Sequence, residues 1–181
     1  MLIAYRRSVR TYSWPSLRPA WPRLALAIAL FASRPAVAAD ETVELVYLQT
    51  GARLVVRVDH LPSPSTLNRF LRCPSERRYT LMDPRLIVRA VEAARTFGVP
   101  RVEIVSAFRT AGLVEAQRAA GRTVTLRSRH INGQALDIRL PGVDTEALCT
   151  HFLTRRQGGV GCYRRSRFIH IDVGPTRSWS G

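Results

Sequence analysis

Residues 128–137 read SRHINGQALD and residues 168–172 read FIHID, and these two stretches decide the fold around them. Gly133 permits a tight turn between His130 and the apolar run 135–140. His130 is therefore expected to fold back over the start of a strand that carries Asp137. One short segment then supplies two polar side chains to the same place.

The second stretch has the alternation of a strand with one face in the core. Apolar residues at 169, 171 and 173 alternate with Phe168, His170 and Asp172. Successive side chains of a strand point to opposite faces, so His170 and Asp172 are predicted to point the same way.

His130, Asp137 and His170 are together predicted to be the three protein ligands of one Zn²⁺ per chain. Imidazole nitrogen and carboxylate oxygen suit this ion, and a site with three protein ligands leaves a fourth position for a water that takes part in chemistry. The pattern is typical of a metallohydrolase.

These stretches resemble the signature of the LAS group of zinc peptidases, which includes lysostaphin, the D-alanyl-D-alanine peptidases and the hedgehog signalling domain. That signature is His-x6-Asp followed by a His on a later strand. Within the group the chain most resembles the YcbK-type murein endopeptidases, and the similarity extends to residues 67–72, 82–86, 105–110, 158–163 and 168–179. It implies a hedgehog/D-Ala-D-Ala-peptidase-like fold and cleavage of peptide bonds in peptidoglycan.

Two catalytic residues are predicted. Arg109 follows a strand end and matches an arginine that faces the substrate in the family, where a guanidinium holds a carboxylate or an oxyanion. Asp172 is either a general base or an acceptor that orients an imidazole. Both roles stay open, because the positions at which relatives carry an acid or a further His hold Arg167 and Phe168 here.

Ser128 and Tyr163 are predicted to contact substrate. His60 and His151 are not expected to bind metal, because the first lies in a loop and the second in an apolar helix. Trp179 is expected to pack at an edge of the core.

The N-terminus has the pattern of a secretory signal. Residues 1–39 contain six Arg and no acid. Within them lie the nine-residue apolar run 24–32 and, after it, the small residues Ala36-Val37-Ala38. The run is far shorter than the roughly 20 residues that span a bilayer, so no permanent membrane anchor is expected. Cleavage after Ala38, by an export route left open, leaves residues 39–181 as one zinc peptidase domain in the periplasm.

The charge is strongly positive. Of 28 basic residues, six precede residue 39, which leaves 22 against 13 acids, a net charge of +9. All are Arg. They are scattered rather than clustered with aromatic residues, so nucleic acid is not the expected partner, and the cell wall or membrane surface is the favoured polyanion.

The remaining pattern predicts α+β architecture, a mostly antiparallel sheet with helices packed on one side. A hairpin is expected at 43–48 and 53–58, a loop at 61–65, and helices at 83–98, 110–120 and 144–154. Strands are expected at 102–106, 134–140, 160–163 and 168–173. Cys73, Cys149 and Cys162 allow one disulfide, with all three pairings open.

The preferred interpretation is an exported zinc metallopeptidase, a monomer, that cleaves peptide cross-links or stem peptides of peptidoglycan by metal-activated water. Two alternatives remain. One is a hedgehog-like zinc-binding recognition module without catalysis, and the other is a basic cell-wall or nucleic-acid binder. The sequence leaves D,D against L,D cross-links and endopeptidase against carboxypeptidase undecided.

Overall fold

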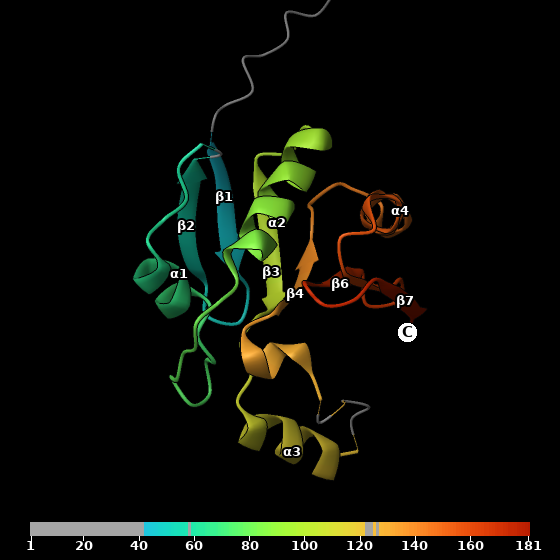
Figure 1. Cartoon of the computed structure of the whole chain (residues 1–181). Helices are drawn as coiled ribbons and strands as arrows, with labels where there is room; N and C mark the ends of the chain where they lie inside the picture. The colour runs from blue at the N-terminus through green and yellow to red at the C-terminus, as the bar shows by residue number, and fades with distance from the viewer. Residues whose placement is uncertain (1–41, 58, 122–124, 126) are drawn as a thin grey trace, which may run out of the picture. The chain divides into compact units, whose positions relative to one another are not determined.

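The computed structural model describes residues 42–57, 59–121, 125 and 127–181. The predicted signal peptide and its cleavage site lie outside the described residues. Within them, no helix is both long and apolar enough to cross a membrane. Figure 1 shows the described elements along the chain.

The described strands form one mixed sheet in the order β2-β1-β3-β4-β6-β5-β7. β1 pairs parallel with β3 and β5 with β7, and the four other neighbouring pairs are antiparallel. The predicted α+β class with a mostly antiparallel sheet is therefore confirmed, as is the N-terminal hairpin. The strands are β1 Thr42–Tyr47, β2 Ala52–Arg57, β3 Arg101–Ser106, β4 Ala135–Arg139, β5 Gly159–Tyr163, β6 Phe168–Asp172 and β7 Arg177–Ser180.

The three predicted helices are present, and each begins at a capping side chain. Asp83 accepts a hydrogen bond from the backbone of α2, Thr110 from that of α3, and Asp144 from that of α4. These caps satisfy N–H groups that the first turn of a helix leaves unpaired. The helices are α2 Pro84–Thr96, α3 Ala111–Ala119 and α4 Thr145–Arg155, with a short 3-10 helix η1 Arg129–Asn132 before β4.

The expectation of a loop at 61–65 was wrong at its end, because helix α1 Pro64–Phe70 begins there. The Ser63 hydroxyl accepts from the Thr66 N–H at 3.3 Å, and Pro64 occupies the first turn, where its fixed φ is helical and its missing N–H has no cost. Two prolines in five residues suggested a loop, whereas the second marks a helix start.

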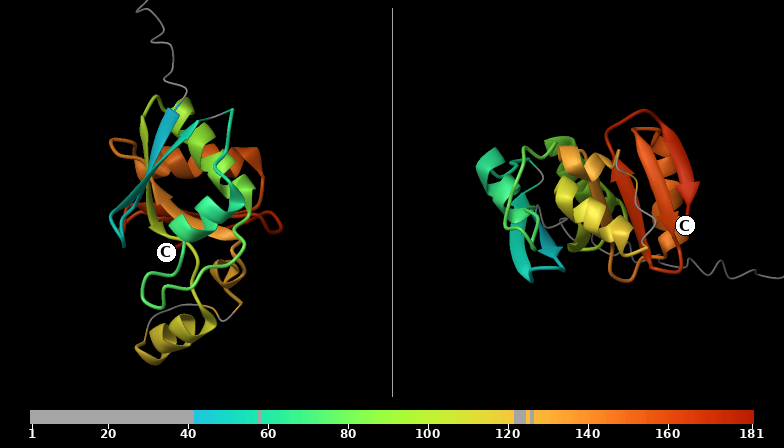
Figure 2. Two further views of the ribbon diagram at one scale, coloured as in Figure 1. Left: turned by 90° about the vertical axis from the view of Figure 1, so that its left-hand side faces the viewer. Right: turned by 90° about the horizontal axis from the view of Figure 1, so that it is seen from below.

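The main core lies between one face of the sheet and α1, α2 and α4. Leu136 and Ile138 of β4 and Ile169 and Ile171 of β6 are fully buried in it. α2 and α4 meet on this face, where the Arg89 guanidinium lies 5.5 Å from the centroid of an aromatic ring of α4. The helices that cover the sheet therefore share one side, as predicted, while α3 lies beyond the ends of β3 and β4 (Figures 1 and 2).

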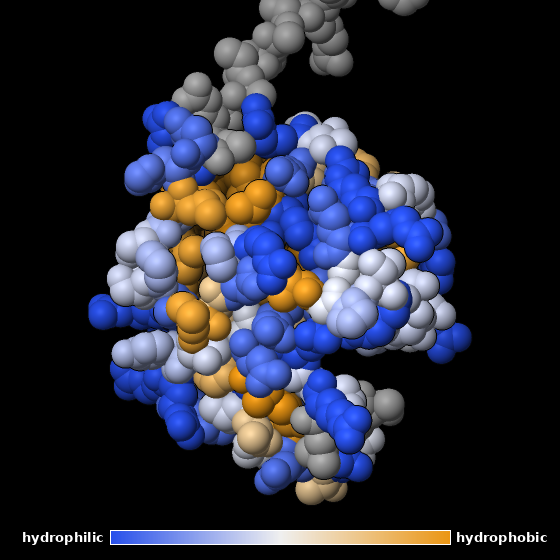
Figure 3. Space-filling view, viewed as in Figure 1, coloured by the Kyte–Doolittle hydropathy of each residue, from blue (hydrophilic) through white to orange (hydrophobic). Residues whose placement is uncertain are grey.

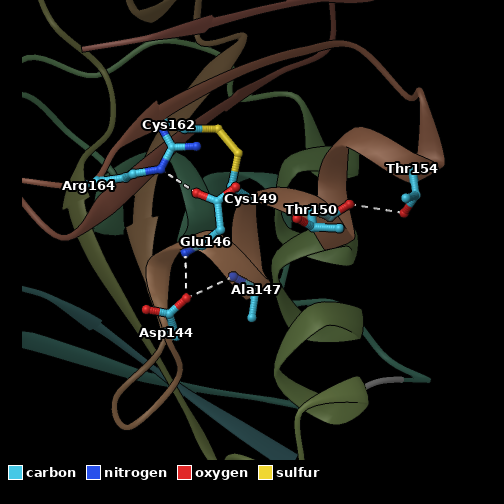
Figure 4. Close-up of a disulfide and its surroundings, with 8 residues drawn as sticks. All are labelled: Asp144, Glu146, Ala147, Cys149, Thr150, Thr154, Cys162 and Arg164. Carbon is cyan, nitrogen blue, oxygen red and sulfur yellow. Dashed lines mark hydrogen bonds and ion pairs between the residues drawn. A yellow bond between two sulfur atoms is a disulfide. The ribbon is translucent and has the colours of Figure 1, made fainter.

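In the described residues one disulfide joins Cys149 of α4 to Cys162 of β5 (Figure 4). Cys73 is buried and free. Of the three pairings that the sequence left open, this one ties the helix layer to the sheet. The sequence separation is 13 residues. A crosslink of this kind stabilises chiefly by restricting the unfolded chain.

Replacing Cys149 and Cys162 together by Ala is expected to lower the free energy of unfolding by about 3 kcal/mol, the value for closing a loop of this length. Guanidinium unfolding of the double variant and the wild type measures the change. Reduction of the wild type should give the same midpoint as the double variant. Equal midpoints for oxidised wild type and variant would contradict a stabilising crosslink.

Candidate metal centre

His130, Asp137 and His170 come together on the face of the sheet opposite the covering helices. Asp137 and His170 are directly paired in the antiparallel register of β4 and β6. His130 reaches them from η1, which ends at Gly133 with a φ of +66°. The tight turn predicted at Gly133 is confirmed, and a Cβ there would also collide with the carbonyl oxygen of Leu81.

The three candidate ligand atoms form a small triangle. His130 Nε2 lies 3.2 Å from Asp137 Oδ1 and 3.1 Å from His170 Nδ1, and His170 Nδ1 lies 2.9 Å from Asp137 Oδ1. All three residues are buried. Three donor atoms this close suit one ion bound at about 2 Å by each.

The other ring nitrogens have hydrogen-bond acceptors of their own. His130 Nδ1 lies 2.6 Å from the Ala107 carbonyl oxygen, and His170 Nε2 lies 3.3 Å from Asp172 Oδ2. If these nitrogens carry the protons, the lone pairs of His130 Nε2 and His170 Nδ1 both face a carboxylate oxygen. Such a donor set needs a cation, so the residues fit a zinc ion, with outer acceptors fixing the tautomers.

The electrostatics favour the ligand form of two of these residues. Burial lowers the pKa of His130, which keeps its imidazole neutral. Burial alone would raise the pKa of Asp137, but the two neighbouring imidazoles hold it well below its ordinary value. For His170 burial acts in the lowering direction, and its hydrogen bonds to Asp137 and Asp172 outweigh it and raise the pKa. A metal ion would displace that proton.

Arg109 lies just after β3 and contacts the second oxygen of the Asp137 carboxylate. Its Nη2 donates to Asp137 Oδ2 at 2.7 Å and its Nε donates to Ser106 Oγ at 2.8 Å. This pairing leaves Asp137 Oδ1 for the ion. Arg109 also lines the cavity described below. The sequence did not predict that Arg109 contacts Asp137, nor that Ser106 accepts a hydrogen bond from Arg109.

Asp172 is completely buried beneath His170. Its Oδ2 accepts from Arg177 Nη2 at 2.6 Å as well as facing His170 Nε2, and its Oδ1 accepts from the backbone N–H groups of Gly159 and Gly174. Burial acts against ionisation, but these donors outweigh it and hold the pKa of Asp172 below its ordinary value. Of the two predicted roles, this arrangement favours the acceptor that orients His170.

A cavity of about 450 Å³ is lined in part by the three candidate ligands. Ser128 and Tyr163, the two predicted substrate-binding residues, both line it. Figure 3 shows the surface hollowed between the C-terminal strands and the part that carries α3. The sequence did not assign the other polar and aromatic lining residues Thr125, Arg127, Arg129, Phe168, Arg177 and Trp179.

The expectation that Trp179 packs at a core edge was wrong. Trp179 lies on β7, an edge strand that the sequence did not predict, and its ring lines the cavity beside His170. The sequence signal that could have indicated this position of Trp179 is the pair Gly159 and Gly161. Glycines in a strand mark places where another part of the chain packs closely against it. In the part of the chain that the structure describes, His60 and His151 are not members of the His130, Asp137 and His170 cluster.

Replacing Arg109 by Lys is expected to leave about one zinc per chain and to lower turnover by one to two decades, or roughly 1.4 to 2.8 kcal/mol of transition-state stabilisation. A single ammonium cannot reproduce planar contacts to both Ser106 and Asp137. Elemental analysis and steady-state rates on muropeptides measure the two quantities. Arg139→Lys is the matched control, because Arg139 lies on the same strand as Asp137 and pairs with Glu103. Near-wild-type turnover of Arg109→Lys would exclude a catalytic role for Arg109.

A mixed α+β domain with a His, Asp, His cluster that lines a cavity of arginine and aromatic side chains has the features of a mononuclear metallohydrolase. Residues 36–179 match the model of the family described as Peptidoglycan L,D-endopeptidase MepK. The chain belongs to this family, which confirms the murein endopeptidase branch predicted from the sequence.

Curated relatives have the same description. The chain is 34% identical over 114 residues to the Peptidoglycan L,D-endopeptidase MepK of Escherichia coli strain K12, covering 62% of this chain and 63% of the relative. It is 35% identical over 102 residues to the Probable peptidoglycan L,D-endopeptidase MepK of Haemophilus influenzae, covering 55% of each. The aligned part thus spans less than two thirds of these relatives. No solved structure matches the chain.

Proposed function

We propose that this protein is a zinc-dependent endopeptidase that cleaves L,D cross-link peptides of peptidoglycan. The observation that carries the proposal is the triangle of His130 Nε2, Asp137 Oδ1 and His170 Nδ1 at the floor of an open cavity. Family membership supports the peptidase activity, and the names of the relatives support the L,D bond.

His130, Asp137 and His170 would hold the zinc ion, which when bound polarises a carbonyl and lowers the pKa of water. Asp172 keeps the Nε2 proton of His170 in place, and the Ala107 carbonyl does the same for Nδ1 of His130. Arg109 fixes the Asp137 carboxylate and presents the rest of its guanidinium to the cavity, where it stabilises negative charge that develops on the substrate.

The proposal is tested by digesting purified muropeptides that contain either L,D or D,D cross-links, with and without a zinc chelator. We expect cleavage of the L,D cross-link, its loss with chelator, and its return when zinc is added back. Mass spectrometry of the new ends names the bond. Cleavage of D,D cross-links alone would change the assigned bond, and zinc binding without any cleavage would support a recognition module instead.

We further propose that the protein is exported to the periplasm and that residues 1–38 are removed. The six Arg, the apolar run and Ala36-Val37-Ala38 support this proposal. The intact mass of protein recovered from the cell envelope measures it, and the expected mass is that of residues 39–181. Recovery of the full 20.3 kDa chain would instead indicate an uncleaved N-terminal anchor.

A further inference from the structure

Trp179 crosses a neighbouring strand to reach a candidate zinc ligand. In the sheet, Gly161 of β5 is paired with Trp179 on one side and with His170 on the other. A Cβ at position 161 would lie 2.5 to 2.8 Å from three atoms of the indole, so only a glycine leaves room for this ring. The indole extends over Gly161, and its centroid lies 5.2 Å from that of the His170 imidazole.

Further contacts fix the orientation of the indole. Trp179 Nε1 donates to Tyr163 Oη at 3.0 Å, and the ring of Tyr163 stacks on Phe168 with centroids 4.6 Å apart. The Arg177 guanidinium lies 5.1 Å from the indole centroid. The ring is only partly buried, and it lines the cavity with His130 and His170. A fixed ring loses little further freedom when a ligand packs on it.

We propose that Trp179 is a specificity-determining residue that binds the aliphatic part of the substrate peptide beside the zinc site. The inference rests on the proposed endopeptidase function. Trp179, Tyr163 and Phe168 supply an aromatic wall, and Arg109, Arg127 and Arg129 make other parts of the lining cationic. The cavity therefore suits a peptide that combines an aliphatic segment with free carboxylates.

A purely structural role does not explain the position of this ring. The core of the sheet lies on the side of the disulfide and α4, whereas Trp179 lies on the side of the zinc ligands. A glycine at position 161 stabilises the strand less than a larger residue would, but it leaves room for an aromatic surface at the cavity. Substrate contact is the use that this surface serves.

Trp179→Ala is expected to lower kcat/KM on the cross-linked muropeptide by about tenfold or more, mainly through a higher KM, because it removes binding that the ground state and the transition state share. Trp179→Phe should retain most of the wild-type kcat/KM. The zinc content of both variants should equal that of the wild type. A structural role predicts instead a lower unfolding midpoint with an unchanged KM.

Gly161→Ala gives an independent test, because it displaces the indole and leaves Trp179 in the chain. We expect it to raise KM as Trp179→Ala does. The double variant Gly161→Ala/Trp179→Ala should be no worse than Trp179→Ala alone, because the added methyl group then has no ring to displace. Additive losses, or a wild-type KM for Trp179→Ala, would overturn the inference.

Binding without turnover is measured by the fluorescence of Trp179 itself. The other two tryptophans, Trp14 and Trp21, lie within residues 1–38, which we propose are removed, so Trp179 is the sole tryptophan of residues 39–181. Adding a peptidoglycan stem peptide to zinc-loaded protein of residues 39–181 should change its emission in a saturable way. A saturable change without cleavage of any cross-link would support the contact and refute the endopeptidase function. Cleavage with unchanged emission, together with an unchanged KM in Trp179→Ala, would support the endopeptidase function and refute the contact with Trp179.

Discussion

His170→Ala is expected to reduce the zinc content from about one per chain to near zero and to abolish cleavage of muropeptides. His170 supplies one corner of the ligand triangle, 2.9 Å from Asp137 Oδ1 and 3.1 Å from His130 Nε2. With two ligands left, the site loses both affinity and the geometry that zinc requires. Elemental analysis of the purified variant and the wild type measures the loss.

The same variant should also lose the stabilisation that zinc gives. A ligand that binds only the folded state raises the free energy of unfolding in proportion to the logarithm of its free concentration over Kd. We therefore expect added zinc to raise the unfolding temperature of the wild type and to leave that of His170→Ala unchanged. His60→Ala is the matched control, because His60 is exposed and outside the cluster. Equal zinc content in the wild type and His170→Ala would exclude this ligand set.

Asp172→Asn is expected to weaken zinc binding by about 10- to 100-fold, with activity partly restored by excess zinc. The carboxylate accepts only, and every contact it makes is with a donor, including Arg177 Nη2 and the Gly174 N–H. An amide brings two N–H donors into this pocket and cannot accept at every contact. His170 then loses the acceptor that fixes its ring. Competition with a chromogenic chelator measures the zinc affinity.

The rival role for Asp172 gives a different result. A general base predicts retained zinc affinity, a large fall in kcat and no rescue by excess metal. Asp59→Asn controls for the loss of a carboxylate, because Asp59 is exposed and paired with Arg57. If Asp172→Asn changes neither zinc affinity nor rate, both roles are wrong, and the base lies in another cavity residue or in the substrate.

Local sequence determined the elements that carry the candidate ligands and two of the helices that cover the sheet. The turn at Gly133, the strand alternation at 168–172 and the caps Asp83 and Asp144 depend on residues within a few positions of each other. Such patterns reflect backbone geometry and side-chain periodicity, so they can be followed without the fold. The candidate ligand set was predicted from two short motifs and the resemblance that they carry.

The outer contacts of the site depended on strand order, which the sequence did not predict. Arg177 reaches Asp172 and Trp179 reaches His170 because β7 pairs parallel with β5, and glycines 159 and 161 leave both paths open. The pairing of Cys149 with Cys162 was undecided for the same reason, since it depends on which strand lies beneath α4.

Arg109 shows the division within one residue. Its position after a strand end and its match to the family predicted that Arg109 faces the cleft. In the structure Arg109 lines the cavity beside the candidate ligands. Its partner was decided by tertiary structure, because β3 and β4 are antiparallel neighbours and Ser106 is paired with Asp137 across them. Sequence alone determined which residues have the chemistry, and the lateral pairing of strands decided which of them touch, because hydrogen-bonded register joins residues that are far apart in the chain.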